Sequence, residues 1–222
     1  MNPARGSVRR IGMYGGSFDP VHRGHLEPVA AVANRLGLDE VLFVPASCPP
    51  HKPTGPSAPS HHRFAMLALA LAPLPRFGLS DFEVARGGTT YTVETLRQMR
   101  ALHPDDEILL VLGSDALVGF ESWRSWREIL EGHRFAVIHR EPFDYVRTRE
   151  ALSGDLRGRL APEGAVPGDA SEEATIFWGG NEPVTISSTW LRRAIPAGED
   201  LRESLPPSVE AYVRRQLLYA AP

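Results

Sequence analysis

Two histidines, His22 and His25, lie three residues apart, shortly after a pair of glycines. At this spacing both rings share one face of a helix that begins near His22, so both can donate N–H groups to the same anion. The start of a helix also offers unpaired backbone N–H groups and the positive end of the helix dipole, which favour a phosphate group. Paired glycines let a ligand approach the backbone closely. The stretch GGSFDPVHRGHL at residues 15–26 is therefore a candidate phosphate site, to which we assign Gly15, Gly16, Ser17, Phe18, His22 and His25.

A second stretch with phosphate-binding chemistry, ISSTWLRRAI, lies at residues 186–195. Its hydroxyl residues favour the N-terminus of a helix, where backbone N–H groups remain open. Arg192 follows Thr189 by three positions and projects near the same end of that helix, where a guanidinium suits a phosphate. A plain capped helix would use the same residues without a ligand. The candidates in this stretch are Ser187, Ser188, Thr189 and Arg192.

A metal site is the alternative interpretation of the histidines, since five of the eight fall within residues 22–62. The HRGH spacing is not a zinc signature, however, and the single cysteine, Cys48, lies in a proline-rich stretch. No GxxxxGK[ST] stretch occurs, which excludes a P-loop. We therefore predict no zinc site and no metal held mainly by the protein's own side chains. Asp19 could support either the turn before Pro20 or a metal ion, and we favour the turn because Asp before Pro suits it.

The composition is that of an ordinary globular protein, with 42% hydrophobic and 23% charged residues. Twenty-four basic residues stand against 27 acidic ones, a net charge of −3 that argues against nucleic acid as a partner. No apolar run approaches the ~20 residues of a membrane helix. A single cysteine excludes an intrachain disulfide, and the N-terminus shows no apolar signal segment, so we expect a cytoplasmic protein.

Strands and helices are expected to alternate along the chain. This pattern predicts an α/β fold, a Rossmann-like doubly wound parallel sheet with helices on both faces. Ligands of such sheets bind outside the carboxyl ends of the strands, which here selects residues 14–25, 45–55 and 113–123. The expected strands are 9–16, 40–45, 107–113, 134–140 and 174–179, and the expected helices are 25–37, 63–73, 92–104, 208–219 and one that begins within 186–195.

We expect one domain over residues 1–222. Residues 1–140 would form the nucleotide- and acceptor-binding core, and 174–222 the C-terminal part. Between them, 141–173 resembles neither a strand nor a helix and is expected to be a flexible insert. The apolar face of the final helix, 208–219, would also suit contact with a second copy in a homo-oligomer.

The turn GGSFDPVHRGHL resembles the (H/T)xGH signature of the nucleotidyltransferase superfamily, and ISSTWLRRAI is similar to that superfamily's ISSTxIR motif, with Leu191 in place of the commoner Ile. The resemblance implies that the two motifs hold a nucleoside triphosphate from opposite sides. It also implies catalytic roles for His22, His25 and Arg192.

Three further stretches resemble the bacterial nicotinate-nucleotide adenylyltransferase family: PASCPPHKP, EVARGGTTYTVETL and VLGSDALVGFESW. In the second, Thr90 stands where the family usually has Ser. The resemblance implies that Trp123, rather than Trp126, stacks on a pyridine ring and that Asp115 accepts ribose hydroxyls. It further implies ATP and phosphate contacts from Lys52, Gly113 and Asp115, and acceptor contacts from His51, Thr90, Tyr91, Thr92 and Trp123.

The activity implied is transfer of the adenylyl group of ATP to nicotinate mononucleotide, giving nicotinate adenine dinucleotide and pyrophosphate in NAD biosynthesis, with Mg²⁺ carried by the substrate. Two alternatives remain open at this point. One is another transferase of the superfamily, such as phosphopantetheine adenylyltransferase or a cytidylyltransferase. The other is a nucleotide-binding module without catalytic activity. Preference between nicotinate and nicotinamide also stays open.

Overall fold

The computed structural model describes residues 8–49 and 56–220. In this part of the chain six parallel strands form one sheet in the order β3-β2-β1-β4-β5-β6. This arrangement confirms the expected Rossmann-like sheet. The chain order reverses at β1, which pairs with β2 on one side and β4 on the other, and ligands of open α/β sheets bind at such a switch point. The strands are β1 (Arg10–Gly16), β2 (Glu40–Pro45), β3 (Phe77–Leu79), β4 (Glu107–Gly113), β5 (Arg134–Ile138) and β6 (Ile176–Trp178).

Strand β4 illustrates why the strands are continuous apolar runs. Leu109 and Val111 pack into the hydrophobic cluster on one face of the sheet, whereas Leu110 and Leu112 pack into the cluster on the other face. Both faces are therefore buried, as expected for a parallel sheet. The helices are α1 (Arg23–Leu36), α2 (Ser60–Leu71), α3 (Phe82–Arg86), α4 (Thr92–Leu102), α5 (Ser114–Val118), α6 (Trp126–Gly132), α7 (Tyr145–Ala151), α8 (Gly154–Arg159), α9 (Ser188–Ala197) and α10 (Pro207–Arg215).

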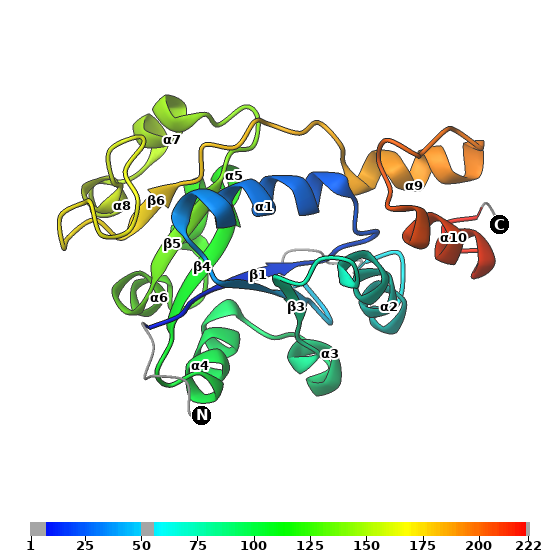
Figure 1. Cartoon of the computed structure of the whole chain (residues 1–222), viewed down its shortest axis with the longest axis horizontal. Coiled ribbons are helices and arrows are strands. Elements are labelled where there is room, and N and C mark those ends of the chain that lie inside the picture. Colours follow the sequence, from blue (N-terminus) through cyan, green and yellow to red (C-terminus); the bar gives the residue numbers. More distant parts are fainter. Residues whose placement is uncertain (1–7, 50–55, 221–222) are drawn as a thin grey trace, which may run out of the picture.

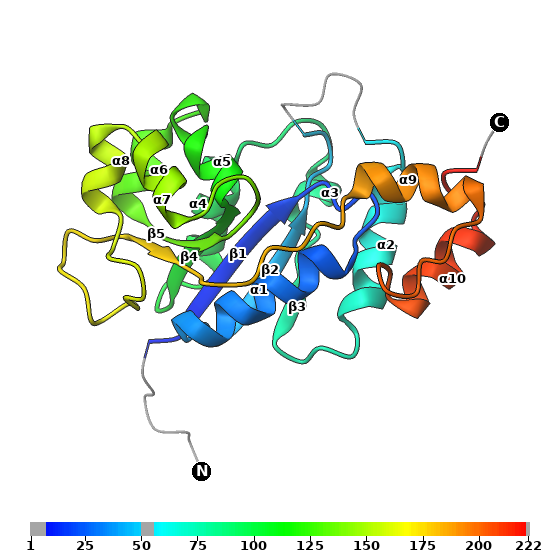
Figure 2. The ribbon, with the colours of Figure 1, turned by 90° about the horizontal axis from the view of Figure 1, so that it is seen from above.

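The helices divide between the two faces of the sheet (Figure 1). Helices α1, α2, α9 and α10 contribute to one hydrophobic cluster, and α4, α6 and the α7–α8 region contribute to the other. The segment between β6 and α9 runs along α1 and carries the second motif to the carboxyl end of β1 (Figure 2). Two stretches far apart in sequence thus meet at one edge of the sheet.

The segment 141–173 differs from the irregular structure expected for it. It contains helices α7 and α8, and Leu152, Leu156 and Ala161 are each at most 2% exposed. These helices are too short and polar to show a clear apolar period, so their formation depends on packing against the sheet. The division of the chain into a core, an insert and a C-terminal part stays a prediction.

Several boundaries also differ from those expected. The short strand β3 and helix α3 were not predicted, and β5 ends at Ile138, which leaves Arg140 beyond the strand. Val209 and Val213 of α10 are buried in the cluster that contains α2, so the apolar face of the last helix is covered within the chain. No helix among the described residues is long and apolar enough to span a membrane.

Candidate functional site

A cavity of about 870 Å³ opens at the carboxyl ends of β1, β2 and β4, where the topology predicts a ligand. It brings together two phosphate motifs and the acceptor stretches that are separate in the sequence. Thr189 and Arg192 are not among the lining residues, and His51 and Lys52 lie outside the described residues. The expected site residues that line the cavity are Gly15, Gly16, Ser17, Phe18, His22, His25, Thr90, Tyr91, Thr92, Gly113, Asp115, Trp123, Ser187 and Ser188.

The turn after β1 depends on a buried aromatic ring. Phe18 is 1% exposed and has a φ of 48°, in the left-handed region that a bulky residue rarely adopts. A Cβ at Gly16 would lie 2.9 Å from this ring, so only glycine fits there. A Cβ at Gly15 would meet no atom within 4 Å, which leaves that stretch of backbone open to the cavity. The turn therefore presents its backbone to a ligand while Phe18 anchors it in the core.

The two histidines lie at the start of α1 with their ring centroids 3.8 Å apart. The backbone N–H of His22, the N-cap residue, donates to Nδ1 of His25 at 3.3 Å. Since Nδ1 of His25 accepts a hydrogen bond, the proton of its neutral ring is on Nε2, which is then a donor. A Cβ at Gly24 would lie 3.0 Å from the His22 ring and 3.2 Å from the carbonyl oxygen of Ile186, so glycine allows the ISST segment to pass this close.

His22 is only 3% exposed, and burial lowers its pKa from 6.5 to about 3, with the positive charge of Arg140 adding to the effect. Its ring is therefore neutral at pH 7 and carries one N–H donor. Its Nδ1 is buried and has no hydrogen-bond partner among the described residues. A buried imidazole with an unused nitrogen next to a cavity is a strong candidate for contact with a ligand.

Asp19 is a buried residue whose carboxylate stabilises the turn after β1 through several hydrogen bonds. Its carboxylate, 2% exposed, accepts hydrogen bonds from the backbone N–H groups of Ser57 (2.7 Å) and Ala58 (3.1 Å) and from the hydroxyl of Tyr219 (2.7 Å). These contacts join three separate parts of the chain. They use both carboxylate oxygens, which agrees with the role in the turn favoured for Asp19. No group of three or more His, Cys, Asp or Glu side chains suited to a metal ion occurs among the residues described.

A second buried centre is Arg63 in α2, which sequence reasoning missed. Its side chain is fully buried and donates to the carbonyl oxygens of Ala58 (3.1 Å), Ser17 (2.8 Å) and Ser47 (3.0 Å). One guanidinium thus joins the turn after β1, the candidate phosphate turn at residues 15–22, to the loop that follows β2. A lone arginine at the start of the apolar stretch 63–73 was the available signal, since such a residue needs several acceptors when buried.

The ISST motif contacts the phosphate turn from the other side. The Ser188 hydroxyl donates to the Pro20 carbonyl oxygen at 3.0 Å, and Ser187 caps α9 by accepting from the Trp190 N–H at 3.1 Å. Arg192 donates to the Asp19 carbonyl oxygen at 2.8 Å and lies 3.8 Å from its carboxylate. In this structure Arg192 therefore supports the turn, and its direct contact with a triphosphate stays a prediction.

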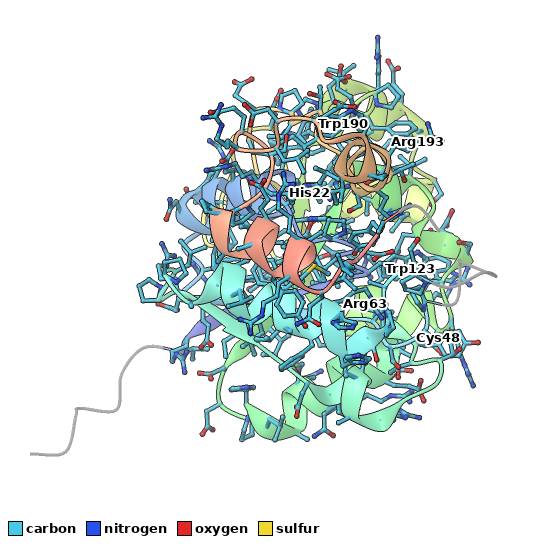
Figure 3. The ribbon with its side chains drawn as sticks, turned by 90° about the vertical axis from the view of Figure 1, so that its right-hand side faces the viewer. His22, Cys48, Arg63, Trp123, Trp190 and Arg193 are labelled. Carbon is cyan, nitrogen blue, oxygen red and sulfur yellow. The ribbon has the colours of Figure 1, made fainter. Side chains whose placement is uncertain are left out.

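Aromatic side chains form another part of the cavity wall. Trp123 is half-buried against Phe120, with ring centroids 5.4 Å apart, and lines the cavity, whereas Trp126 does not. Tyr91 caps α4, and Thr90 beside it is 5% exposed with a buried Oγ1 that has no partner in the described part of the chain. Figure 3 shows Trp123 toward the margin of the molecule and His22 nearer its middle. This wall can stack on a flat ring and hydrogen-bond its substituents.

Arg140 is the main functional candidate that sequence reasoning missed. It lines the cavity and donates to the Tyr14 hydroxyl at 3.1 Å. The Ser114 hydroxyl accepts from the backbone N–H of Arg140 and donates to its carbonyl oxygen. A Cβ at Gly113 would collide with the side chains of Arg140 and Asp115, so glycine makes room for this cation. Its place as the last residue of the predicted strand 134–140 was a usable signal, because strand ends point at the ligand.

A smaller cavity of about 490 Å³ lies elsewhere, between α1, α2 and the Pro206–Pro207 turn. Its lining is mostly apolar and includes neither His22 nor His25. The chemistry-bearing residues are gathered in the larger cavity, which is the candidate active site.

Comparisons with known proteins agree with this geometry. Residues 13–194 match the family described as cytidylyltransferase-like. The chain is 36% identical over 215 residues, 96% of each protein, to a protein of Symbiobacterium thermophilum named "Probable nicotinate-nucleotide adenylyltransferase". It is 35% identical to one of the same name from Synechococcus sp. (strain JA-3-3Ab), with 100% of both chains covered.

Solved structures show the same fold at lower identity. The Plasmodium falciparum nicotinic acid mononucleotide adenylyltransferase complexed with NaAD aligns with a TM-score of 0.71 and 21% identity, covering 95% of this chain and 97% of that one. The same enzyme complexed with APC aligns with a TM-score of 0.69 and 20% identity over the same shares of the two chains. From the matches over almost its whole length, the chain belongs to the cytidylyltransferase-like family and, within it, to the nicotinate-nucleotide adenylyltransferases.

Proposed function

We propose that this protein transfers the adenylyl group of ATP to nicotinate mononucleotide, releasing pyrophosphate. One observation carries the proposal: a single cavity is lined both by two imidazoles at a helix start and by the aromatic side chains of Trp123 and Tyr91. The imidazoles suit a triphosphate and the aromatic side chains an aromatic ring. A mononucleotide with a pyridine base has a flat ring for the aromatic residues and a phosphate that can reach the triphosphate.

The reaction needs alignment more than proton transfer. The second pKa of a phosphate monoester is near ~6, so the acceptor is largely a dianion at neutral pH. One of its oxygens attacks the α-phosphorus of ATP, and the bond from that phosphorus to the bridging oxygen of pyrophosphate breaks. The bonding electrons leave with pyrophosphate. No general base is required, and the protein's part is to hold the two phosphates in line.

His22 and His25 would donate N–H groups to phosphate oxygens as negative charge moves toward pyrophosphate. The neutral state of His22 supports this role, since it supplies a donor without the desolvation cost of a buried cation. Arg140 would add a fixed positive charge at the carboxyl end of the sheet. Mg²⁺ would arrive bound to ATP, held by phosphate oxygens and water, since the Asp19 carboxylate is already occupied.

The decisive experiment measures pyrophosphate release with ATP, Mg²⁺ and nicotinate mononucleotide, with phosphopantetheine as the competing acceptor. Release with the pyridine nucleotide alone supports the proposal, and release only with phosphopantetheine contradicts it. His25→Ala should lower kcat by about 10²–10³-fold, as expected when one phosphate donor is lost. Trp123→Ala should raise the KM for the pyridine nucleotide and leave that for ATP unchanged, whereas Trp126→Ala should change neither.

A further inference from the structure

Arg124, directly after Trp123, is a cation in the aromatic wall of the cavity. Its side chain is exposed and lines the cavity together with Trp123, Tyr91 and Thr92. Its Cζ lies 4.6 Å from the centroid of the Tyr91 ring, within the range of a cation–π contact. The Tyr91 ring thus holds the guanidinium in the same part of the cavity wall as Trp123, on which the proposed function stacks the pyridine ring.

The nearby carboxylate of Glu94 takes its hydrogen bonds from other groups, and its pKa is lowered most by the bond from the Tyr91 backbone and least by the charge of Arg124. Glu94 accepts a hydrogen bond from the backbone N–H of Tyr91 with one oxygen, at 3.0 Å, and from Arg86 with the other, at 3.1 Å. Among the residues that the structure describes, Arg124 forms no ion pair with an acidic side chain. Its N–H donors therefore remain directed toward solvent or the cavity, where an anionic ligand can reach them.

The chain contains a matched pair for comparison. Arg127, three residues later, lies over the Trp126 ring at 4.2 Å but does not line the cavity. Both arginines are exposed and stack on an aromatic side chain. Only Arg124 is placed to contact a ligand, so a comparison of the two separates an effect on the ligand from a general effect of positive charge.

We infer that the Arg124 side chain is a specificity-determining residue that binds the 3-carboxylate of the pyridine ring and favours nicotinate over nicotinamide mononucleotide. This inference rests on the proposed function. Nicotinate carries a full negative charge beside its ring, and nicotinamide carries a neutral amide. A guanidinium can form a bidentate ion pair with the two carboxylate oxygens, whereas the amide offers one uncharged acceptor oxygen and an NH2 group that cannot accept, so the arginine discriminates by charge as well as by shape.

The test is the ratio of kcat/KM for nicotinate mononucleotide to that for nicotinamide mononucleotide, in the full-length protein at fixed saturating ATP. Arg124→Gln should lower the ratio by about tenfold, chiefly by raising the KM for the nicotinate substrate. Arg124→Lys, which keeps the charge, should retain most of the preference. Arg127→Gln should leave the ratio within about twofold of the wild type.

The outcomes separate this inference from the proposed function. A wild-type protein that adenylates neither pyridine nucleotide contradicts the proposed function itself. A wild-type protein that uses both equally well overturns only the role of Arg124. The role is also overturned if Arg124→Gln lowers kcat/KM for both nucleotides by the same factor, because the arginine would then merely support Tyr91.

Discussion

Because His22 is buried and neutral, the free energy of unfolding should depend on pH, and the substitution His22→Asn should remove this part of the dependence. In the folded protein the pKa of His22 is about 3, whereas the ordinary value of 6.5 applies to the unfolded chain. Between these two values the unfolded chain binds a proton that the folded protein does not. The free energy of unfolding therefore falls as the pH falls through this window, and it is unaffected by His22 above pH 6.5.

The size of the effect follows from the two pKa values. Each pH unit below 6.5 costs up to 1.36 kcal/mol, so a change from pH 7.5 to 5.0 should remove about 2 kcal/mol of stability through His22 alone. Because the ring is 3% exposed, solvent screening reduces this value little. The loss is a substantial part of the ~5–15 kcal/mol that stabilises an ordinary domain.

Urea unfolding at pH 7.5 and 5.0 measures the effect, in the wild type and in His22→Asn. The variant should be less stable at pH 7.5 but should lose about 2 kcal/mol less than the wild type on going to pH 5.0. His133→Asn is a comparison variant outside the candidate site, and because burial also lowers the pKa of His133, it should weaken the pH dependence of stability in the same direction. Its effect should add to that of His22→Asn in the double variant.

Equal losses in the wild type and His22→Asn would refute the reasoning. They would mean that His22 is protonated in the folded protein near its ordinary pKa, and that the ring is not held neutral beside the cavity. Carboxylates that titrate in the same range do not affect the comparison, since both proteins carry them.

Three further predictions concern the residues that support the site. Arg63→Met leaves three carbonyl oxygens without their donor and should lower the free energy of unfolding in urea by about 3–4 kcal/mol. The control Arg97→Met, at an exposed ion pair, should lower it by under about 1 kcal/mol, and similar values for the two variants would show that water replaces the Arg63 contacts. Gly113→Ala pushes a methyl group into the side chains of Asp115 and Arg140 and should lower kcat/KM by about 10²-fold with a small change in melting temperature. Full activity would mean that the reaction depends on the position of neither side chain. Tyr219→Phe deletes the hydroxyl that donates to the Asp19 carboxylate and should lower the free energy of unfolding by about 1–2 kcal/mol, measured by calorimetry. An unchanged melting temperature would contradict that hydrogen bond.

Much of the site is determined locally. The spacing of His22 and His25, with a glycine pair before them, places both rings at the start of one helix whatever the rest of the chain does. The continuous apolar run at 107–113 similarly predicts a strand buried on both faces, and β4 has these bounds. Alternation of such strands with helices was enough for the parallel, doubly wound sheet, because crossover connections restrict the topology to few forms.

The partners of these residues depend on the tertiary structure. Arg140 reaches Tyr14 across 126 positions of sequence, and Tyr219 reaches Asp19 across 200. Such contacts are set by strand order and register, which no local pattern encodes. The same holds for the fully buried Arg63, whose acceptors are backbone carbonyls that any residue could supply. Local spacing thus determined which groups could bind a phosphate, and only the assembled sheet decided which charges and supports surround them.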